Sequence, residues 1–245
     1  MRKDSDDSFH AASKTAAAQL HAGGFFVIPN VVPAPSLERI CAAYDRAFAA
    51  ATVPDLRTSR SGGDTRLIDL LNRGAEFDEL YTLQPVLSAC LETIGPRFKL
   101  SSFGGRTVLP GAAAQGLHVD ARPDQDAWPL LGFIVMVDEF RSDNGATRFV
   151  PGSHRAETPT GAREGNHRPA DASEVLACGE AGSVIVYLGS TWHGYGANRS
   201  TTPRRSIQGT YIPRDGSAAV QWASRITPET LGRLSPSARH LLAIE

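Results

Sequence analysis

Apolar side chains follow two different periods in the two halves of this chain. Up to about residue 94 they recur every third or fourth residue, the spacing of a helix with one buried face. A Gly23-Gly24 pair stops the first such pattern, and Pro35 suits the first turn of another. The pattern predicts helices over 9–21, 35–51 and 77–94, the last kinked or divided by Pro85, with a strand over 25–28 between the first two.

Beyond Pro96 the apolar runs become short or alternating, and Gly, Pro, Asn and Asp separate them. These runs predict strands over 98–103, 107–109, 131–137, 147–150, 183–188 and 204–212. Short strands with regular turns are typical of an antiparallel sandwich or barrel. Because helices lead and strands follow, we predict a mainly β fold with flanking helices: a double-stranded β-helix, or cupin-like jelly roll.

A chain of 245 residues with 41% hydrophobic content can bury a full core. We expect one domain over 1–245, with mostly helical support and lid segments in 1–96, the β-helix core in 97–212 and a C-terminal tail in 213–245. The tail is expected to close with a helix from Thr227 or Pro228 to Leu242. Polar segments at 57–73, 121–129 and 155–174 are the candidate lids.

Charge and composition favour work on small molecules. The formal net charge is -1 and the sequence pI is about 6.7, so no overall basic field attracts nucleic acid or anionic lipid. The N-terminus lacks an apolar signal region, and no run approaches the roughly 20 apolar residues that cross a bilayer. Three widely spaced cysteines are typical of reduced thiols. We expect a cytoplasmic monomer or homodimer that binds a small-molecule substrate and neither nucleic acid nor membrane.

Two histidines and an aspartate are the candidate metal ligands. Of the seven histidines only His118 has an acidic residue, Asp120, two positions later. Residues two apart on a strand point to the same side, and His193 follows another predicted strand at a glycine-rich turn. Two imidazoles and one carboxylate hold one face of a mononuclear non-haem iron(II) and leave the other face open for a co-substrate and dioxygen. Alone, the His118/Asp120 pair would be an ordinary exposed strand pair; His193 and Arg204 shift the balance to a metal site.

Arg204 and Ser206 follow His193 by eleven and thirteen positions, on a predicted strand. Their spacing lets both side chains face inward, where a guanidinium needs an anionic partner. The far carboxylate of 2-oxoglutarate would be such a partner, with support from the serine hydroxyl. Arg205 should point the other way, as a solvated surface charge.

Three long stretches and a short one resemble the phytanoyl-CoA dioxygenase-like family of Fe(II)/2-oxoglutarate oxygenases: Gln115–Asp120, Asp143–His154, His193–Ser200 and Pro203–Ser206. The resemblance implies iron ligation by His118, Asp120 and His193, and a salt bridge from Arg204 to 2-oxoglutarate. It also implies hydrogen bonds to the co-substrate from Gln115 and Thr147. Related halogenases replace the ligand carboxylate with a small residue, so the presence of Asp120 disfavours halogenation.

Arg66 and Arg106 are the candidate substrate contacts. Arg66 belongs to an arginine-containing polar segment, where solvated charges are also common. Arg106 lies on a predicted strand and could contact substrate or only pair internally.

The resulting hypothesis is an Fe(II)/2-oxoglutarate-dependent dioxygenase that uses O2 to oxidise, in the simplest case to hydroxylate, a C–H bond of a specialised metabolite, with release of succinate and CO2. Two alternatives stay open. A metal-dependent jelly-roll isomerase or lyase would use the same ligands without 2-oxoglutarate, and a non-catalytic jelly-roll binding protein would load metal without turnover.

Overall fold

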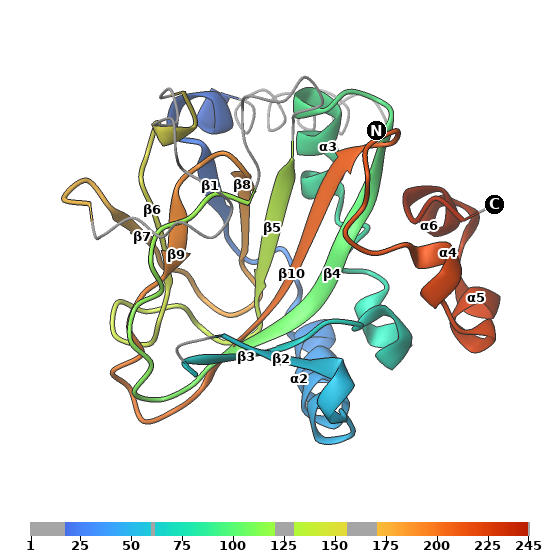
Figure 1. Cartoon of the computed structure of the whole chain (residues 1–245), viewed down its shortest axis with the longest axis horizontal. Helices are drawn as coiled ribbons and strands as arrows, with labels where there is room; N and C mark the ends of the chain where they lie inside the picture. Colours follow the sequence, from blue (N-terminus) through green and yellow to red (C-terminus); the bar gives the residue numbers. More distant parts are fainter. Residues whose placement is uncertain (1–17, 60–61, 121–129, 156–170, 245) are drawn as a thin grey trace.

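A computed structural model describes residues 18–59, 62–120, 130–155 and 171–244 (Figure 1). Two antiparallel sheets form its centre. The larger has the strand order β1 (Phe25–Ile28), β8 (Val184–Leu188), β5 (Leu131–Met136), β10 (Arg204–Pro213), β4 (Phe98–Val108), β3 (Asp64–Leu67) and β2 (Leu56–Thr58). The smaller has the order β7 (Val175–Ala177), β6 (Thr147–Phe149) and β9 (His193–Tyr195). The predicted jelly roll with flanking helices is confirmed.

Strand β5 shows why the large sheet lies in the middle of the molecule. All six of its residues are buried and none is polar, as expected where both faces of a strand are covered. Phe133 and Val135 belong to the main core on the helical side, whereas Ile134 and Met136 belong to a second cluster that includes Phe149 of the small sheet. The second cluster therefore lies between the two sheets.

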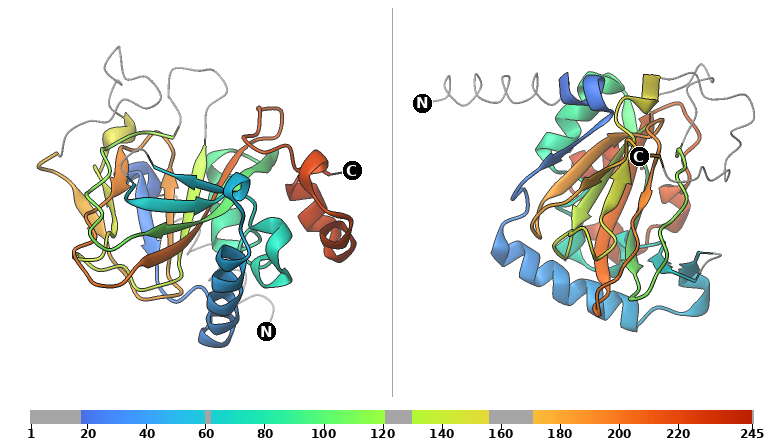
Figure 2. Two further views of the ribbon diagram at one scale, coloured as in Figure 1. Left: turned by 60° about the horizontal axis from the view of Figure 1, so that its bottom comes forward. Right: turned by 90° about the vertical axis from the view of Figure 1, so that its left-hand side faces the viewer.

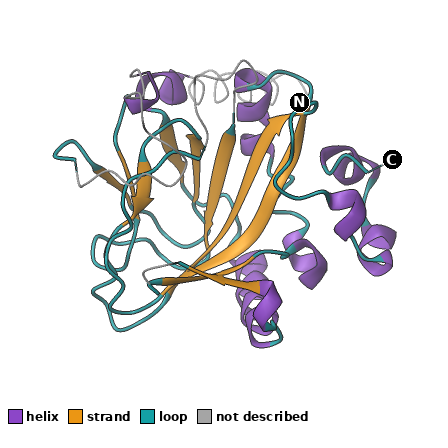
Figure 3. Ribbon diagram, in the orientation of Figure 1, coloured by secondary structure: helices purple, strands orange, loops and turns teal. Residues whose placement is uncertain are grey.

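Helices cover the outer face of the large sheet (Figure 3). In α2 (Ala34–Ala49) the buried residues Ile40, Ala43, Tyr44 and Ala47 recur at helical spacing, and the helix crosses the strands (Figure 2). The Tyr44 hydroxyl lies 2.9 Å from the Thr107 hydroxyl of β4. α3 (Gln84–Thr93) packs against β5. No helix among the described residues has the length and apolar character to cross a membrane.

Helix boundaries differ from prediction in two places. The 77–94 pattern does not form one helix: a 3-10 turn over Ala75–Phe77 is followed by α3, and Pro85 lies in the first turn of α3, where its missing N–H costs nothing. The expected closing helix from Thr227 or Pro228 to Leu242 is two short helices, α5 (Pro228–Arg233) and α6 (Pro236–Leu241), and a further short helix that was not predicted, α4 (Trp222–Arg225), precedes them. Thr227 and Ser235 cap the N-termini of α5 and α6, so the second helix begins at a cap of its own and the helical pattern is divided there.

The proposed lid over 57–73 is wrong for much of its length, because β2 and β3 occupy part of it and extend the large sheet beyond β4. The polar sequence of β3 does not indicate a strand, but its backbone pairs with the edge of β4. The two short predicted strands over 98–109 are one continuous strand, β4, and neither β7 nor β9 was predicted. Most of the expected helix over 9–21, the expected lid over 121–129 and residues 156–170 of the expected lid over 155–174 lie outside the described residues; residues 18–23 are helical.

Candidate metal and co-substrate site

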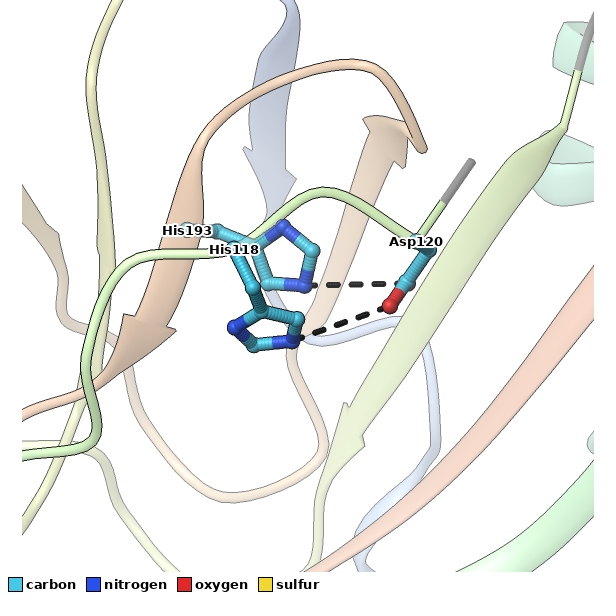
Figure 4. A group of neighbouring side chains, drawn as sticks. All are labelled: His118, Asp120 and His193. Atoms are coloured by element: carbon cyan, nitrogen blue, oxygen red, sulfur yellow. Dashed lines mark ion pairs between the residues drawn. The ribbon is translucent and has the colours of Figure 1, made fainter. Parts of the chain in front are cut away.

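His118, Asp120 and His193 converge between the two sheets (Figure 4). Their ligand atoms all lie within 4.8 Å of one another. His118 Nε2 is 3.7 Å from one Asp120 carboxylate oxygen, and His193 Nε2 is 3.6 Å from the other. Spacings of this size leave room for one ion among three donors that each bind at about 2.0–2.2 Å.

Backbone pairing brings the three ligands together. The amides and carbonyls of His118 and His193 exchange two hydrogen bonds of 2.9 Å, so the segment before Asp120 runs antiparallel to β9. The Asp120 N–H donates to the Gly189 carbonyl just after β8. His118 and Asp120 thus lie on a segment held between β9 of the small sheet and the end of β8 of the large sheet, and His193 lies on β9 itself.

Each imidazole is turned so that Nε2 faces the candidate metal position. His193 Nδ1 lies 2.9 Å from the Thr191 carbonyl, and His118 Nδ1 lies 3.3 Å from the Gly116 carbonyl. A carbonyl fixes the proton on Nδ1 and leaves the Nε2 lone pair for a metal. Burial first, and the neighbouring His193 second, lower the pKa of His118 to about 3. The His118 ring is therefore neutral at physiological pH, the form that binds metal.

Tyr187 of β8 donates a 2.6 Å hydrogen bond from its hydroxyl to Asp120 Oδ2. Burial opposes the charge on Asp120, but the two histidines and this hydrogen bond hold its pKa below the usual value. Burial and the charge of Asp120 raise the pKa of Tyr187, so its hydroxyl keeps its proton. A Cβ on Gly132 would meet the tyrosine ring at 2.1 Å, which shows that the ring needs a glycine on the neighbouring strand.

Sequence reasoning did not predict this bond. The contact joins residues 67 positions apart, and no local pattern marks it.

A small cavity of about 30 Å³ adjoins the three ligands. Two other predicted site residues, Thr147 of β6 and Arg106 of β4, line it with them. Gln208 of β10 also lines it and was not predicted. Gln208 lies two residues beyond Ser206 on the same strand, so the two-residue alternation that predicted inward side chains for Arg204 and Ser206 also predicts one for Gln208. Arg204, Ser206, Gln115 and Arg66 are not among the residues that line this cavity.

Arg204 lies on the inner face of β10, with 1% of its surface exposed. Its Nη2 donates to the Gly145 carbonyl at 2.9 Å, and the guanidinium carbon lies 4.1 Å from the centroid of the Phe140 ring. Nε and Nη1 are buried with no hydrogen-bond partner, and no carboxylate among the described residues forms an ion pair with Arg204. Burial, and then the like charge of Arg106, lowers the pKa of Arg204 to about 9, which leaves it cationic at neutral pH.

Ser206 and Gln115 flank this region less directly. The Ser206 hydroxyl donates to the Arg106 carbonyl at 3.3 Å and accepts from Gln208 at 3.4 Å. The Gln115 side-chain oxygen accepts a long, 3.5 Å hydrogen bond from the Tyr195 N–H, and its carbonyl accepts from Arg148 of β6. Both side chains lie beside the site without contacting the three metal ligands.

Arg66 and Arg106 stand opposite each other in the register of β3 and β4 and share one carboxylate. Asp64, fully buried, lies 3.0 Å from Arg66 Nε and 3.2 Å from Arg106 Nε. Burial disfavours the charge on Asp64, yet Arg106, with hydrogen bonds from Ser59 and Arg66, holds its pKa below the usual value. Sequence reasoning missed Asp64, which lies in the segment that was predicted to be a lid.

Arg205 points to the opposite face, as predicted, but it is not a free surface charge. Its guanidinium contacts both carboxylate oxygens of Asp138 and also Asp45, at distances of 2.7–3.2 Å. It therefore ties β10 to α2 and to Asp138, two residues after the end of β5.

A jelly roll with a two-histidine, one-carboxylate site between its sheets defines a class of metal-binding proteins. The sequence profile of the phytanoyl-CoA dioxygenase (PhyH) family matches residues 20–206, and the chain belongs to this family.

Similar named relatives are fungal dioxygenases. Dioxygenase cdmA of Talaromyces verruculosus is 37% identical over 108 residues, which are 41% of this chain and 35% of the relative. Dioxygenase olcK of Penicillium canescens is 40% identical over 114 residues, 43% of this chain and 36% of the relative. The chain thus matches little more than a third of the length of these relatives.

Solved structures support the same fold. The α-ketoglutarate-dependent epimerase SnoN from nogalamycin biosynthesis superposes with a TM-score of 0.71 at 23% identity, covering 83% of this chain and 84% of that one. HygX from Streptomyces hygroscopicus, with nickel and 2-oxoglutarate bound, superposes with a TM-score of 0.68 at 16% identity, covering 84% and 89%. At these identities the likeness establishes the fold.

Proposed function

We propose that this protein is an Fe(II)/2-oxoglutarate-dependent dioxygenase that oxidises, in the simplest case hydroxylates, a C–H bond of a small molecule and releases succinate and CO2. The observation that carries the proposal is the pairing of a three-ligand metal site with a buried arginine that lacks a carboxylate partner. An isomerase or lyase that does not use 2-oxoglutarate, or a binding protein with the same three ligands, has no need for that arginine.

The donor set fits iron(II). The imidazoles of His118, which is neutral, and His193 and the charged carboxylate of Asp120 supply two nitrogens and one oxygen, and such a triad leaves coordination positions open. The groups that orient these ligands are also in place, because two carbonyls hold the imidazoles and Tyr187 holds the carboxylate.

Arg204 fits a dicarboxylic co-substrate. A guanidinium with two buried, unpartnered N–H groups costs free energy that a carboxylate would recover through charge-assisted hydrogen bonds. In our proposal Arg204 binds the far carboxylate of 2-oxoglutarate, Ser206 supports it, and Thr147 and Gln115 donate further hydrogen bonds.

When bound, iron with 2-oxoglutarate and O2 supplies the oxidising power for the C–H bond. The protein contributes position and exclusion of water. Asp120 and the two histidines hold the metal, and Arg204 sets the distance between the co-substrate and the metal. The apolar side chains of Ile134, beside the metal ligands, and of Phe140, beside Arg204, limit the access of water. Tyr187 keeps its proton and holds Asp120 Oδ2 by a hydrogen bond.

We also propose that the substrate is a specialised metabolite, that residues 1–245 act as one domain and that the protein acts in the cytoplasm, as a monomer or homodimer and without nucleic acid. Among the structural neighbours, SnoN belongs to nogalamycin biosynthesis, and HygX was crystallised with hygromycin B. Neighbours described as an epimerase and as a carbocyclase show that this fold supports outcomes other than hydroxylation, so product analysis must decide the outcome.

The test is anaerobic loading of the full chain with Fe(II) and 2-oxoglutarate, followed by a metabolite library and O2. Oxygen-dependent succinate release that rises with one compound supports the proposal, and the double variant His118→Ala/His193→Ala serves as the metal-free control. Turnover of a compound without 2-oxoglutarate would instead establish an isomerase or lyase, and metal loading with no succinate from any compound would favour a binding protein.

A further inference from the structure

A second cavity adjoins the metal site. It measures about 370 Å³, within the range of small-molecule sites, whereas the cavity at the ligands has room for little more than an ion. Arg106 and Gln208 line both cavities, so the two meet across these side chains. The larger cavity is lined by residues of β3 and β4, by Gln208 of β10, and by the segment before α4 together with Arg225 of α4.

The walls of this second cavity combine apolar surface with arginine. The apolar surface comes from Ile68, Ala219 and Val220, and Leu67 and Phe103, whose side chains are buried in the main core, border the cavity. Main-chain hydrogen bonds hold Ala219 and Val220 in place: the Val220 N–H donates to the Ser101 carbonyl and the Ala219 N–H to the Ser101 hydroxyl, both at 2.9 Å. The apolar wall is therefore preformed and does not depend on the segments outside the described residues.

Positive charge exceeds negative charge around the second cavity. Arg66, Arg106 and Arg225 line it. Among the described residues, their ion-pair partners are two carboxylates: Asp64, which Arg66 and Arg106 share, and Asp69, which lies 3.8 Å from Arg225. Three guanidinium groups and no carboxylate line the cavity itself, and Arg66 and Arg106, opposite each other on the sheet, share the single charge of Asp64. The other carboxylate that attracts Arg106 is Asp120, a candidate metal ligand.

We infer that the second cavity is the substrate pocket and that it takes an organic anion, an apolar body carrying one carboxylate, sulfonate or phosphate, with the anionic group beside Arg225 and Arg106. The inference rests on the proposed function, because it assigns the substrate of the same metal site. The side chain of Arg225 on α4 is 47% exposed, so it is placed to meet the anion at the mouth of the pocket. Arg106 and Gln208 then lie between the bound molecule and the metal ligands.

The test is direct binding of a matched probe pair. 8-Anilinonaphthalene-1-sulfonate is an aromatic body with one sulfonate, and N-phenyl-1-naphthylamine is the same body without the charge. Fluorescence titration of the full chain, loaded anaerobically with Fe(II) and 2-oxoglutarate, should show one site that prefers the sulfonate. Arg225→Gln should weaken sulfonate binding by about 3- to 10-fold, the effect of losing a partly exposed charge, and should leave the neutral probe unchanged. Arg97→Gln, an exposed arginine outside the lining, is the charge control.

A second variant tests the location independently of charge. Ala219→Trp fills the pocket from an exposed position and should abolish binding of both probes at an unchanged melting temperature, whereas Ala223→Trp on the exposed face of α4 should not. Equal affinity for the two probes, or sulfonate binding unaltered by both Arg225→Gln and Ala219→Trp, overturns the inference. Neither titration needs turnover, so succinate release can succeed while the pocket assignment fails, and the reverse.

Discussion

Arg204 and Arg205 are neighbours on β10, yet they have opposite environments. Arg205 faces α2 and makes four short contacts to Asp138 and Asp45. Arg204 faces the space between the sheets, more deeply buried, with one hydrogen bond to a carbonyl and two N–H groups without partners. The first arginine completes a structural ion pair. The second keeps free the hydrogen-bonding capacity that a ligand needs, and the difference separates a residue that stabilises the fold from one that we propose binds the co-substrate.

The largest expected effect is at Arg204. Arg204→Ala should raise the KM for 2-oxoglutarate by one to several orders of magnitude, about 2–5 kcal/mol, because the co-substrate loses its paired charge. The melting temperature of the ligand-free protein should hold or rise, since an uncompensated buried charge is removed. Steady-state kinetics with thermal melts check both parts, and an unchanged KM would refute the role of Arg204.

The next largest effect is expected at Tyr187, which holds the candidate metal ligand Asp120 by a hydrogen bond. Tyr187→Phe keeps the ring over Gly132 but removes the hydrogen bond to Asp120, so the affinity for Fe(II) should fall by about 10- to 100-fold. Anaerobic titration with Fe(II), or with Co(II) as a spectroscopic substitute, measures it. Phe103→Leu, a core change outside the ligands, is the matched control; a loss of metal affinity there equal to that in Tyr187→Phe would show that packing, not the hydroxyl, governs binding.

Arg205 should show the reverse pattern from Arg204. Arg205→Ala should lower the free energy of unfolding by about 1–2 kcal/mol, between the values for exposed and fully buried pairs, because the guanidinium and Asp138 are each only about a quarter exposed. The KM for 2-oxoglutarate should stay the same. Chemical denaturation and kinetics on one preparation make the test; a change in KM as large as that of Arg204→Ala would remove the distinction between the two arginines.

The smallest expected effect is at Ser206. Ser206→Ala should raise the KM for 2-oxoglutarate only about 2- to 10-fold, the value of one neutral hydrogen bond of roughly 0.5–1.5 kcal/mol. Ser206→Thr retains the hydroxyl and should restore much of the loss. If Ser206→Ala changed the stability but not the KM, the role of this serine would be limited to its structural hydrogen bonds with Arg106 and Gln208.

Local patterns determined much of the fold. Alternating or wholly apolar runs predicted β5, β8 and β10, because a strand with one buried face alternates apolar and polar residues and a strand with two buried faces is apolar throughout. The β3 strand was missed because Asp64, Thr65 and Arg66 are polar, and only pairing with β4 makes them a strand. β9 was missed because its three residues, His193 to Tyr195, are too few to show a period.

For the candidate site, the sequence alone identified the three residues that converge as candidate metal ligands and the inward direction of Arg204 and Ser206, because side chains two apart on a strand share a face and the ligand types match one chemistry. Tertiary structure decided what those residues meet. The Tyr187–Asp120 hydrogen bond, the sharing of Asp64 by two arginines and the different surroundings of Arg204 and Arg205 all join residues far apart in the chain. Such contacts depend on strand register and sheet packing, which short-range periodicity does not encode.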